Sequence, residues 1–145
     1  MARLKFCDIL NKMKLKFFMQ KVIPAVLWVI LIFLLSAVPG GDYPPAVFDY
    51  GIIAHLVEFF VLGYLLARAL GGYSFKNLCL SLVICLLYAL SDEFHQAFVP
   101  YRSVSMVDWL VDVFGSTAGI FVYYKRNLPW RRDPSTPNNS QGRSG

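Results

Sequence analysis

The chain has 145 residues, of which 57% are hydrophobic, and its mean hydropathy is +0.51. A soluble domain of this size has too little interior to bury so much apolar surface, so the composition excludes an ordinary soluble protein and indicates a protein that crosses a membrane several times. The formal charge of +5 suggests nucleic acid, but the basic residues flank apolar segments and no nucleic-acid-binding motif is present, so we expect no nucleic-acid partner.

The first 21 residues form a basic segment. Six Lys or Arg residues stand there against one acid, Asp8, and apolar residues are interleaved with them at roughly helical spacing. This pattern is typical of an amphipathic helix that lies on an anionic lipid surface. We therefore predict a basic amphipathic cytoplasmic segment over residues 1–21, with the anionic lipids of the bilayer as its partner.

Four apolar segments follow, and each is long enough to cross a bilayer as a helix. The first stops at Pro39 and the third stops before Pro100, because proline does not continue a helix. The expected fold is all-α: a polytopic four-helix transmembrane bundle over residues 22–124, preceded by the basic segment. Residues 125–145 begin with basic residues and then become rich in Pro, Asn and Ser, so we expect a disordered cytoplasmic tail. The four predicted spans are residues 22–38, 52–70, 75–98 and 106–124.

The distribution of Lys and Arg residues predicts the orientation of the bundle. Six lie in residues 1–21, five lie in residues 125–145, and Arg68 and Lys76 flank the connection between the second and third spans. The other two connections contain only Arg102. Positive charge is enriched on the cytoplasmic side of a membrane, so we predict that both termini are cytoplasmic.

This topology brings the polar residues of three spans to one depth. The second span begins outside, the third ends outside and the fourth begins outside, and each carries its polar residues at that end. Ionisable residues are costly in hydrocarbon, so we expect them to form one extracytoplasmic pocket with a function. The residues that we expect in or beside this pocket are His55, Glu58, Asp92, Glu93, His95, Gln96, Arg102, Asp108 and Asp112.

A stripe of small residues continues the acidic face of the fourth span. Asp108 and Asp112 are four residues apart, and the same face reaches Gly115 and Gly119. Such a G-x-x-x-G pattern lets another helix approach closely. We expect this stripe to face the bundle, and it would also permit a homo-oligomer through Gly115 and Gly119.

Three residues are candidates for acid–base catalysis: His55, Glu58 and Glu93. Neither glutamate is placed to cap a helix, and carboxyl groups held close together cannot all ionise, so at least one is expected to keep a proton that it can donate. For His55 a structural role is the alternative, as a core histidine bonded to Glu58 or Asp92. We expect no metal or cofactor, because no H-x-x-x-H or H-E-x-x-H spacing is present. The candidate binding residues are Asp92, His95, Gln96, Arg102, Asp108 and Asp112.

The acids of the fourth span also have structural alternatives. Asp108 follows Ser105 by three residues, the spacing of a capping box, so its carboxylate could serve the start of the helix. Asp112 lies one turn deeper, and a salt bridge with Arg102 is its structural alternative. For Arg102, capture of an anionic group is the functional alternative.

Two stretches carry several linked motifs: IAHLVEFFVLGYLL (residues 53–66) and SDEFHQAFVPYRSVSMVDWLVDVFGSTAG (residues 91–119). Through these stretches the sequence resembles the VanZ-like family of small bacterial membrane proteins over roughly residues 36–120. Ile52 stands where members often have Lys, Tyr101 replaces the usual Gly, and Ala37 replaces the second Ser of a Ser-Ser-x-Pro. The positions that match the family pattern are His55, Glu58, Glu93, Gln96, Pro100, Arg102, Asp108, Asp112 and Gly115.

The resemblance implies a role in the bacterial cell envelope, since the founding member of the family is associated with resistance to teicoplanin. The protein is then expected in the bacterial cytoplasmic membrane. Its pocket would serve a binding or accessory role, with a lipid-linked envelope component or a drug as ligand. The alternatives are a membrane enzyme that uses carboxylate and His acid–base chemistry on a lipid-linked or amphiphilic substrate, and a small proton-coupled carrier. The residues themselves leave these hypotheses open.

Overall fold

The computed structural model describes residues 12–13, 15–39, 50–71 and 74–128. These residues form helices and contain no strand, and four of the helices are long and apolar enough to cross a membrane, as predicted. The elements are η1 (Phe18–Val22), α2 (Ile23–Ser36), α3 (Tyr50–Leu70), α4 (Phe75–Gln96) and α5 (Met106–Arg126).

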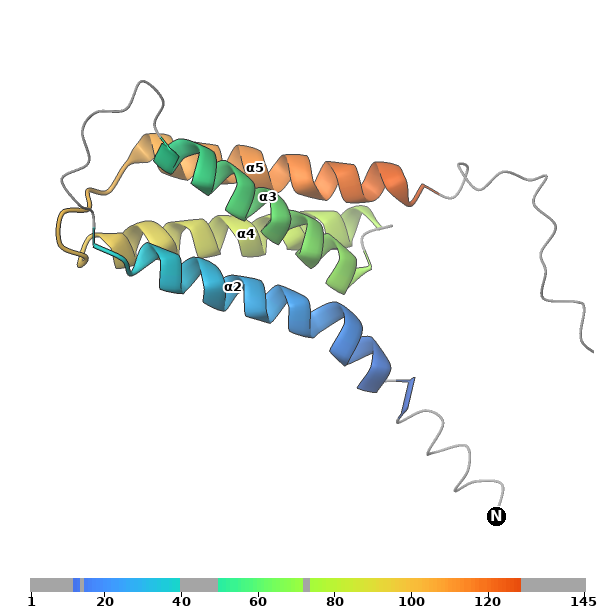
Figure 1. The fold of residues 1–145 in the computed structure, drawn as a ribbon. Coiled ribbons are helices and arrows are strands. Elements are labelled where there is room, and N and C mark those ends of the chain that lie inside the picture. The colour runs from blue at the N-terminus through green and yellow to red at the C-terminus, as the bar shows by residue number, and fades with distance from the viewer. Residues whose placement is uncertain (1–11, 14, 40–49, 72–73, 129–145) are drawn as a thin grey trace, which may run out of the picture.

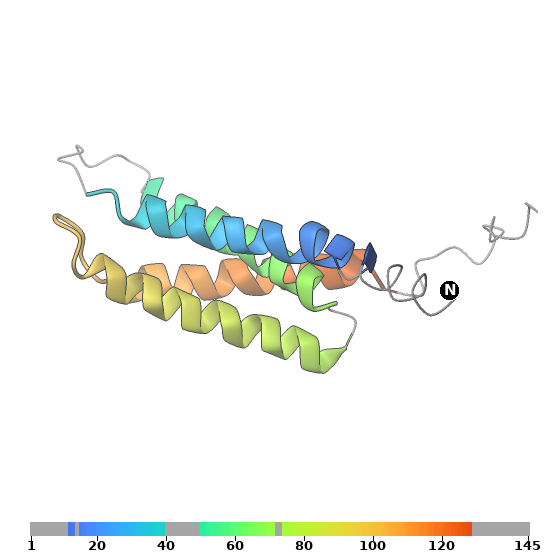
Figure 2. The same cartoon turned by 90° about the horizontal axis from the view of Figure 1, so that it is seen from below.

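The helices lie side by side in an elongated bundle (Figures 1 and 2). α2 and α4 run in one direction, and α3 and α5 run in the other. The ends of α2 and α4 and the beginnings of α3 and α5 therefore lie at the same end of the bundle, which we call the polar end.

The first span begins earlier than predicted. Helix is continuous from Leu15 to Ser36 and includes the π-helical turn η1, whereas the sequence predicted a span that starts at Val22. The π turn ends at Val22, two residues before Pro24, whose missing N–H and ring disturb a regular helix, and the wider turn lets the helix continue through it. Residues 1–11 and 14 of the predicted basic segment and residues 129–145 of the tail lie outside the described residues.

α3 and α5 are parallel neighbours whose backbones touch at glycines. A Cβ at Gly115 would lie 2.6 Å from the carbonyl oxygen of Leu56, and a Cβ at Gly119 would overlap the carbonyl oxygen of Phe60. Gly63 of α3 likewise faces the backbone of Ser116. The predicted small-residue stripe thus faces the bundle. It is covered by α3 of the same chain. The homo-oligomer through Gly115 and Gly119 stays a prediction.

Side-chain hydrogen bonds fasten α2 to its neighbours. The indole Nε1 of Trp28 donates to the backbone oxygen of Glu58 on α3 at 2.8 Å, and the Tyr88 hydroxyl on α4 donates to the backbone oxygen of Val29 at 2.7 Å. Both bonds satisfy polar groups that would otherwise lie in apolar surroundings. The outer surface keeps many large apolar side chains exposed, including Leu87 and Phe114, as expected for helices that face lipid.

The connection from α4 to α5 turns sharply at Val99–Arg102. The N–H of Arg102 donates to the carbonyl oxygen of Val99 at 3.2 Å, and Tyr101 between them has φ = +61°. With Pro100 in the second position, this is the pattern of a type II turn, whose third position favours glycine. Tyr101 therefore occupies a position with a left-handed backbone, which glycine adopts most readily.

Replacing Tyr101 with glycine is expected to stabilise the protein by about 1 kcal/mol, because an L-residue in this conformation costs roughly 1–2 kcal/mol. The Tyr101 side chain is 88% exposed, so little packing is lost. Thermal unfolding in detergent micelles measures the effect. Tyr101→Ala is the matched control, because it keeps a Cβ and therefore the same strain. Equal shifts for the two variants would show that the backbone conformation is not the cause.

Candidate functional site

A buried histidine–aspartate pair connects α3 and α5 at the polar end. The Nδ1 atom of His55 lies 3.0 Å from Oδ1 of Asp112, and the two side chains are 6% and 0% exposed. Within the described part of the chain, it is the one close contact found between a carboxylate and a His, Lys or Arg side chain. The sequence offered Glu58 or Asp92 as partners for His55 and Arg102 as the partner for Asp112, and the structure uses none of these. The close approach at Gly115 brings the two helices near enough for this pair to form.

The pair fixes the chemistry of the imidazole ring. An ionised Asp112 can only accept a hydrogen bond, so Nδ1 of His55 donates to it, and in a neutral imidazole the lone pair then lies on the other nitrogen, Nε2. The described residues provide no hydrogen-bond partner for Nε2, and His55 lines the pocket at this end. A histidine held in this way can bind or accept a proton from a group in the pocket.

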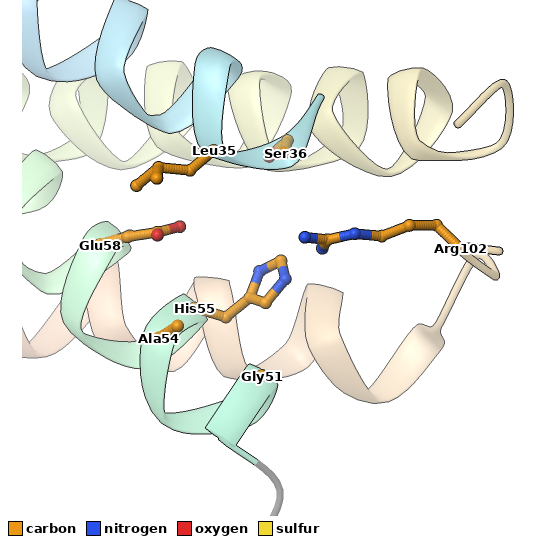
Figure 3. A pocket seen from close by; sticks show the side chains of 7 residues that line it. All are labelled: Leu35, Ser36, Gly51, Ala54, His55, Glu58 and Arg102. Carbon is orange, nitrogen blue, oxygen red and sulfur yellow. The ribbon is translucent and has the colours of Figure 1, made fainter. Parts of the chain in front are cut away.

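The pocket has a volume of about 70 Å³ and lies between the end of α2, the beginning of α3 and the α4–α5 turn. Glu58 and Arg102 point into it from opposite sides, and His55 lies between them (Figure 3). The space holds a few water molecules and is far smaller than the several hundred Å³ of a typical drug-sized site. Only a small polar group of a larger ligand can therefore enter. The residues that line it are Leu35, Ser36, Gly51, Ala54, His55, Glu58 and Arg102.

Arg102 reaches the pocket from the turn between α4 and α5. Its Nε donates to the backbone oxygen of Val38 at 3.3 Å, so the side chain also ties the turn to the end of α2. The rest of the guanidinium group points toward Glu58 and His55 (Figure 3). Arg102 is thus placed where it could hold an acceptor group inside the pocket, and its role as a binding residue stays a prediction.

The acids of α4 lie behind the pocket and are bonded to the protein. The Nε2 of Gln96 donates to Oδ2 of Asp92 at 2.8 Å, and both side chains are buried. Oε2 of Glu93 accepts from the backbone N–H of Ser105 at 2.9 Å. Asp92 and Glu93 are near enough to act electrostatically on Asp112. These residues therefore share one polar cluster with the His–Asp pair but do not line the pocket.

The predicted capping box is formed only in part. The N–H of Asp108 donates to Oγ of Ser105 at 3.2 Å, as the sequence pattern indicated. The reciprocal bond, from the N–H of Ser105, goes to Glu93 and not to Asp108. Glu93 was expected to have no capping role, and that expectation is wrong because the acceptor comes from a different helix.

His95 lies apart from the pocket. Its ring stacks on Phe33 of α2, with ring centroids 4.4 Å apart and an angle of 31° between the planes. His95 and Gln96 are adjacent on α4 and so point about 100° apart, which sends Gln96 into the polar cluster and His95 to the contact with α2.

Sequence reasoning missed two side chains that contribute to the site. Ser36 is buried and lines the pocket, and its signal was the Ser-x-x-Pro that ends the first span. Ser105 was recognised as a helix cap but not as the partner of Glu93. The spacing of residues along the sequence does not indicate a contact of this kind, because its two members belong to different helices.

Several acceptors in the polar cluster have no protein partner. Oδ1 of Asp92, Oε1 of Glu93 and Oδ2 of Asp112 are buried and unbonded among the described residues. Buried acceptors in proteins are normally satisfied by a donor group or by ordered water, so these three oxygens are the atoms of the cluster with unused hydrogen-bonding capacity. Within the described ranges, no three or more His, Cys, Asp or Glu side chains are arranged to hold a metal ion.

Comparison with known proteins identifies a family. The model of a protein family described as VanZ/LLP1 matches residues 18–128, which include all of η1, α2, α3, α4 and α5 and every residue that lines the pocket. No curated protein and no solved structure matches the chain.

Proposed function

Because the chain belongs to the VanZ-like family, we propose that it is a binding or accessory protein of the bacterial cytoplasmic membrane, whose pocket takes the polar group of a lipid-linked or amphiphilic envelope component. The observation that supports this proposal most is the pocket itself. A carboxylate, a guanidinium and an imidazole held by a buried aspartate all face one small space.

The charges of the pocket narrow the ligand class. A simple anion would meet the carboxylate of Glu58, and a simple cation would meet the guanidinium of Arg102, so neither is favoured alone. A ligand group that carries both a hydrogen-bond acceptor and a hydrogen-bond donor can bind both residues. Its acceptor would lie toward Arg102 and its donor toward Glu58. A zwitterionic headgroup is the simplest group of this kind.

The surroundings of the pocket support an amphiphilic ligand. Phe98 is 73% exposed, Tyr101 is 88% exposed and Met106 is 74% exposed, and all three lie in or near the turn that carries Arg102. Aromatic and apolar side chains at the end of a span are typical of the headgroup region of a bilayer. A lipid-anchored ligand would present its polar group at this depth.

The charge distribution supports an extracytoplasmic location for the polar end. Arg102 is the one Lys or Arg at that end among the described residues, whereas Arg68, Lys76, Lys125 and Arg126 lie at the other end. Positive charge is enriched on the cytoplasmic side. Both termini would then be cytoplasmic, and the pocket would face the outer leaflet.

The His55–Asp112 pair favours a second candidate function. A buried carboxylate that orients an imidazole toward a pocket is an arrangement used for general base catalysis. In that case Nε2 of a neutral His55 would take a proton from a substrate group, and a protonated Glu58, on the same helix and in the same pocket, would supply one. The substrate would be the same lipid-linked or amphiphilic component.

Glu58→Gln and Arg102→Gln are expected to weaken binding of short-chain phosphatidylethanolamine, a zwitterionic probe, by about tenfold or more, because each removes a charged hydrogen-bond partner. The affinity is measured by titrating the probe into purified protein in micelles. Lys76→Gln is the control, since Lys76 is exposed at the opposite end. In a host that the protein protects from teicoplanin, the same two variants are expected to restore susceptibility.

If both pocket variants bind the probe and protect the host as fully as the parent protein does, the proposal is refuted.

The enzymatic candidate makes a different prediction for His55→Gln. A chemically altered amphiphile should disappear from the membranes of the host, while binding of the unaltered probe persists.

A further inference from the structure

Glu93 joins two helices through one carboxylate. It lies in the last turn of α4, is 4% exposed, and accepts the backbone N–H of Ser105 at 2.9 Å. Ser105 is the N-cap of α5, and its Oγ accepts the N–H of Asp108. In a capping box the acid of the same helix would accept the N–H of the cap residue. Here the acceptor is Glu93, which belongs to the preceding helix, α4. This hydrogen bond therefore fixes where α5 begins relative to α4.

The turn that carries Arg102 lies between Glu93, at the end of α4, and Ser105, at the beginning of α5. Its first part is held by the end of α4, because the N–H groups of Ala97, Phe98 and Val99 all donate to carbonyls of the last turn of that helix. Arg102 is held in turn by Val99. Residues 103 and 104 make no backbone hydrogen bond in the described structure. The bond from Ser105 to Glu93 is therefore what fixes the far side of the turn.

We propose that Glu93 is a positioning residue, which holds the α4–α5 turn so that the guanidinium group of Arg102 enters the pocket. This role differs from the acid–base role that the sequence suggested for Glu93, and its effect on binding rests on the function proposed for the pocket. Glu93 itself does not line the pocket, and its bonded oxygen is occupied by the protein.

The contact is tested by hydrogen exchange of the Ser105 amide in the full-length protein. Glu93→Gln keeps a side-chain oxygen that can accept the N–H, so protection is expected to persist. Glu93→Ala removes the acceptor, and exchange at Ser105 is expected to be at least about tenfold faster. If Glu93→Ala does not insert into the membrane, Glu93→Met takes its place with the same expectation, because it keeps the side-chain length without the acceptor. Unchanged exchange in the variant without an acceptor would overturn the proposal.

Binding of short-chain phosphatidylethanolamine separates positioning from direct action on the ligand. Glu93→Gln is expected to bind as the parent does, whereas Glu93→Ala is expected to lose about as much affinity as Arg102→Gln, roughly tenfold. The double variant should lose no more than either single one, since both act through one guanidinium group. Lost binding in Glu93→Gln with Ser105 still protected would show that the carboxylate acts on the ligand, which contradicts positioning. If Arg102→Gln binds the lipid fully while the Ser105 amide exchanges as expected in the Glu93 variants, the function proposed for the pocket is refuted. The contact between Glu93 and Ser105 is then still supported.

Discussion

Replacing Gly119 with alanine is expected to lower the free energy of unfolding by about 3 kcal/mol, the upper end of the usual cost of overpacking. The added Cβ would overlap the carbonyl oxygen of Phe60, and its other near neighbour is the backbone nitrogen of Tyr64. A backbone atom cannot rotate away as a flexible side chain can, so α3 and α5 must separate.

Chemical unfolding in micelles measures this effect, and Thr117→Ala is the control. Thr117 is exposed on the same helix two residues away, so its replacement should change the unfolding free energy little. The close approach of α3 and α5 also brings His55 and Asp112 together. Gly119→Ala is therefore also expected to weaken binding of short-chain phosphatidylethanolamine. An alanine variant as stable as the parent would mean that the two helices do not touch at this glycine.

Asp112→Ala is expected to lower the free energy of unfolding by about 3 kcal/mol, because removing one partner of a buried ion pair leaves the other without compensation. His55 would lose its only bonded partner among the described residues and could no longer hold its ring in one orientation. Asp112→Asn keeps an acceptor oxygen opposite Nδ1, so a smaller loss of about 1 kcal/mol is expected.

Asp108→Ala is the matched control for this prediction. Asp108 lies four residues earlier on the same helix, is only half-buried, and contributes mainly through the helix N-terminus, so its removal should cost about 0.5 kcal/mol. Replacing both members of the pair with apolar residues, as in His55→Phe with Asp112→Leu, should recover part of the lost stability. Equal effects of Asp108→Ala and Asp112→Ala would show that the pair does not carry this stability.

The sequence was sufficient to predict the four helices and the common depth of the polar residues. Each span must be apolar over its length, and proline or glycine marks most of the ends. The alternation of direction then places His55, Asp92 and Asp112 at the same end without any knowledge of packing. The start of the first span was the exception, because Pro24 and the basic residues before it look like a boundary although the helix continues through them.

The partners within the polar cluster could not be predicted in the same way. Spacing along a helix assigns residues to a face, but it does not determine how the helices rotate or how closely they approach. The pairing of His55 with Asp112 depends on the backbone contact at Gly115, and the pairing of Glu93 with Ser105 depends on the path of a turn. Both involve residues that are far apart in the sequence.

A photo-reactive amino acid placed at Ala54 in living bacteria tests the central claim most directly. Ala54 is exposed and lines the pocket, so the probe would contact whatever amphiphile places its polar group between Glu58 and Arg102. We predict an adduct of defined mass that forms at position 54, disappears in the Arg102→Gln background, and does not form from Leu87 on the lipid-facing surface. The same mixture of bulk lipid adducts at positions 54 and 87, unchanged by Arg102→Gln, would contradict the existence of a binding pocket at this end of the bundle.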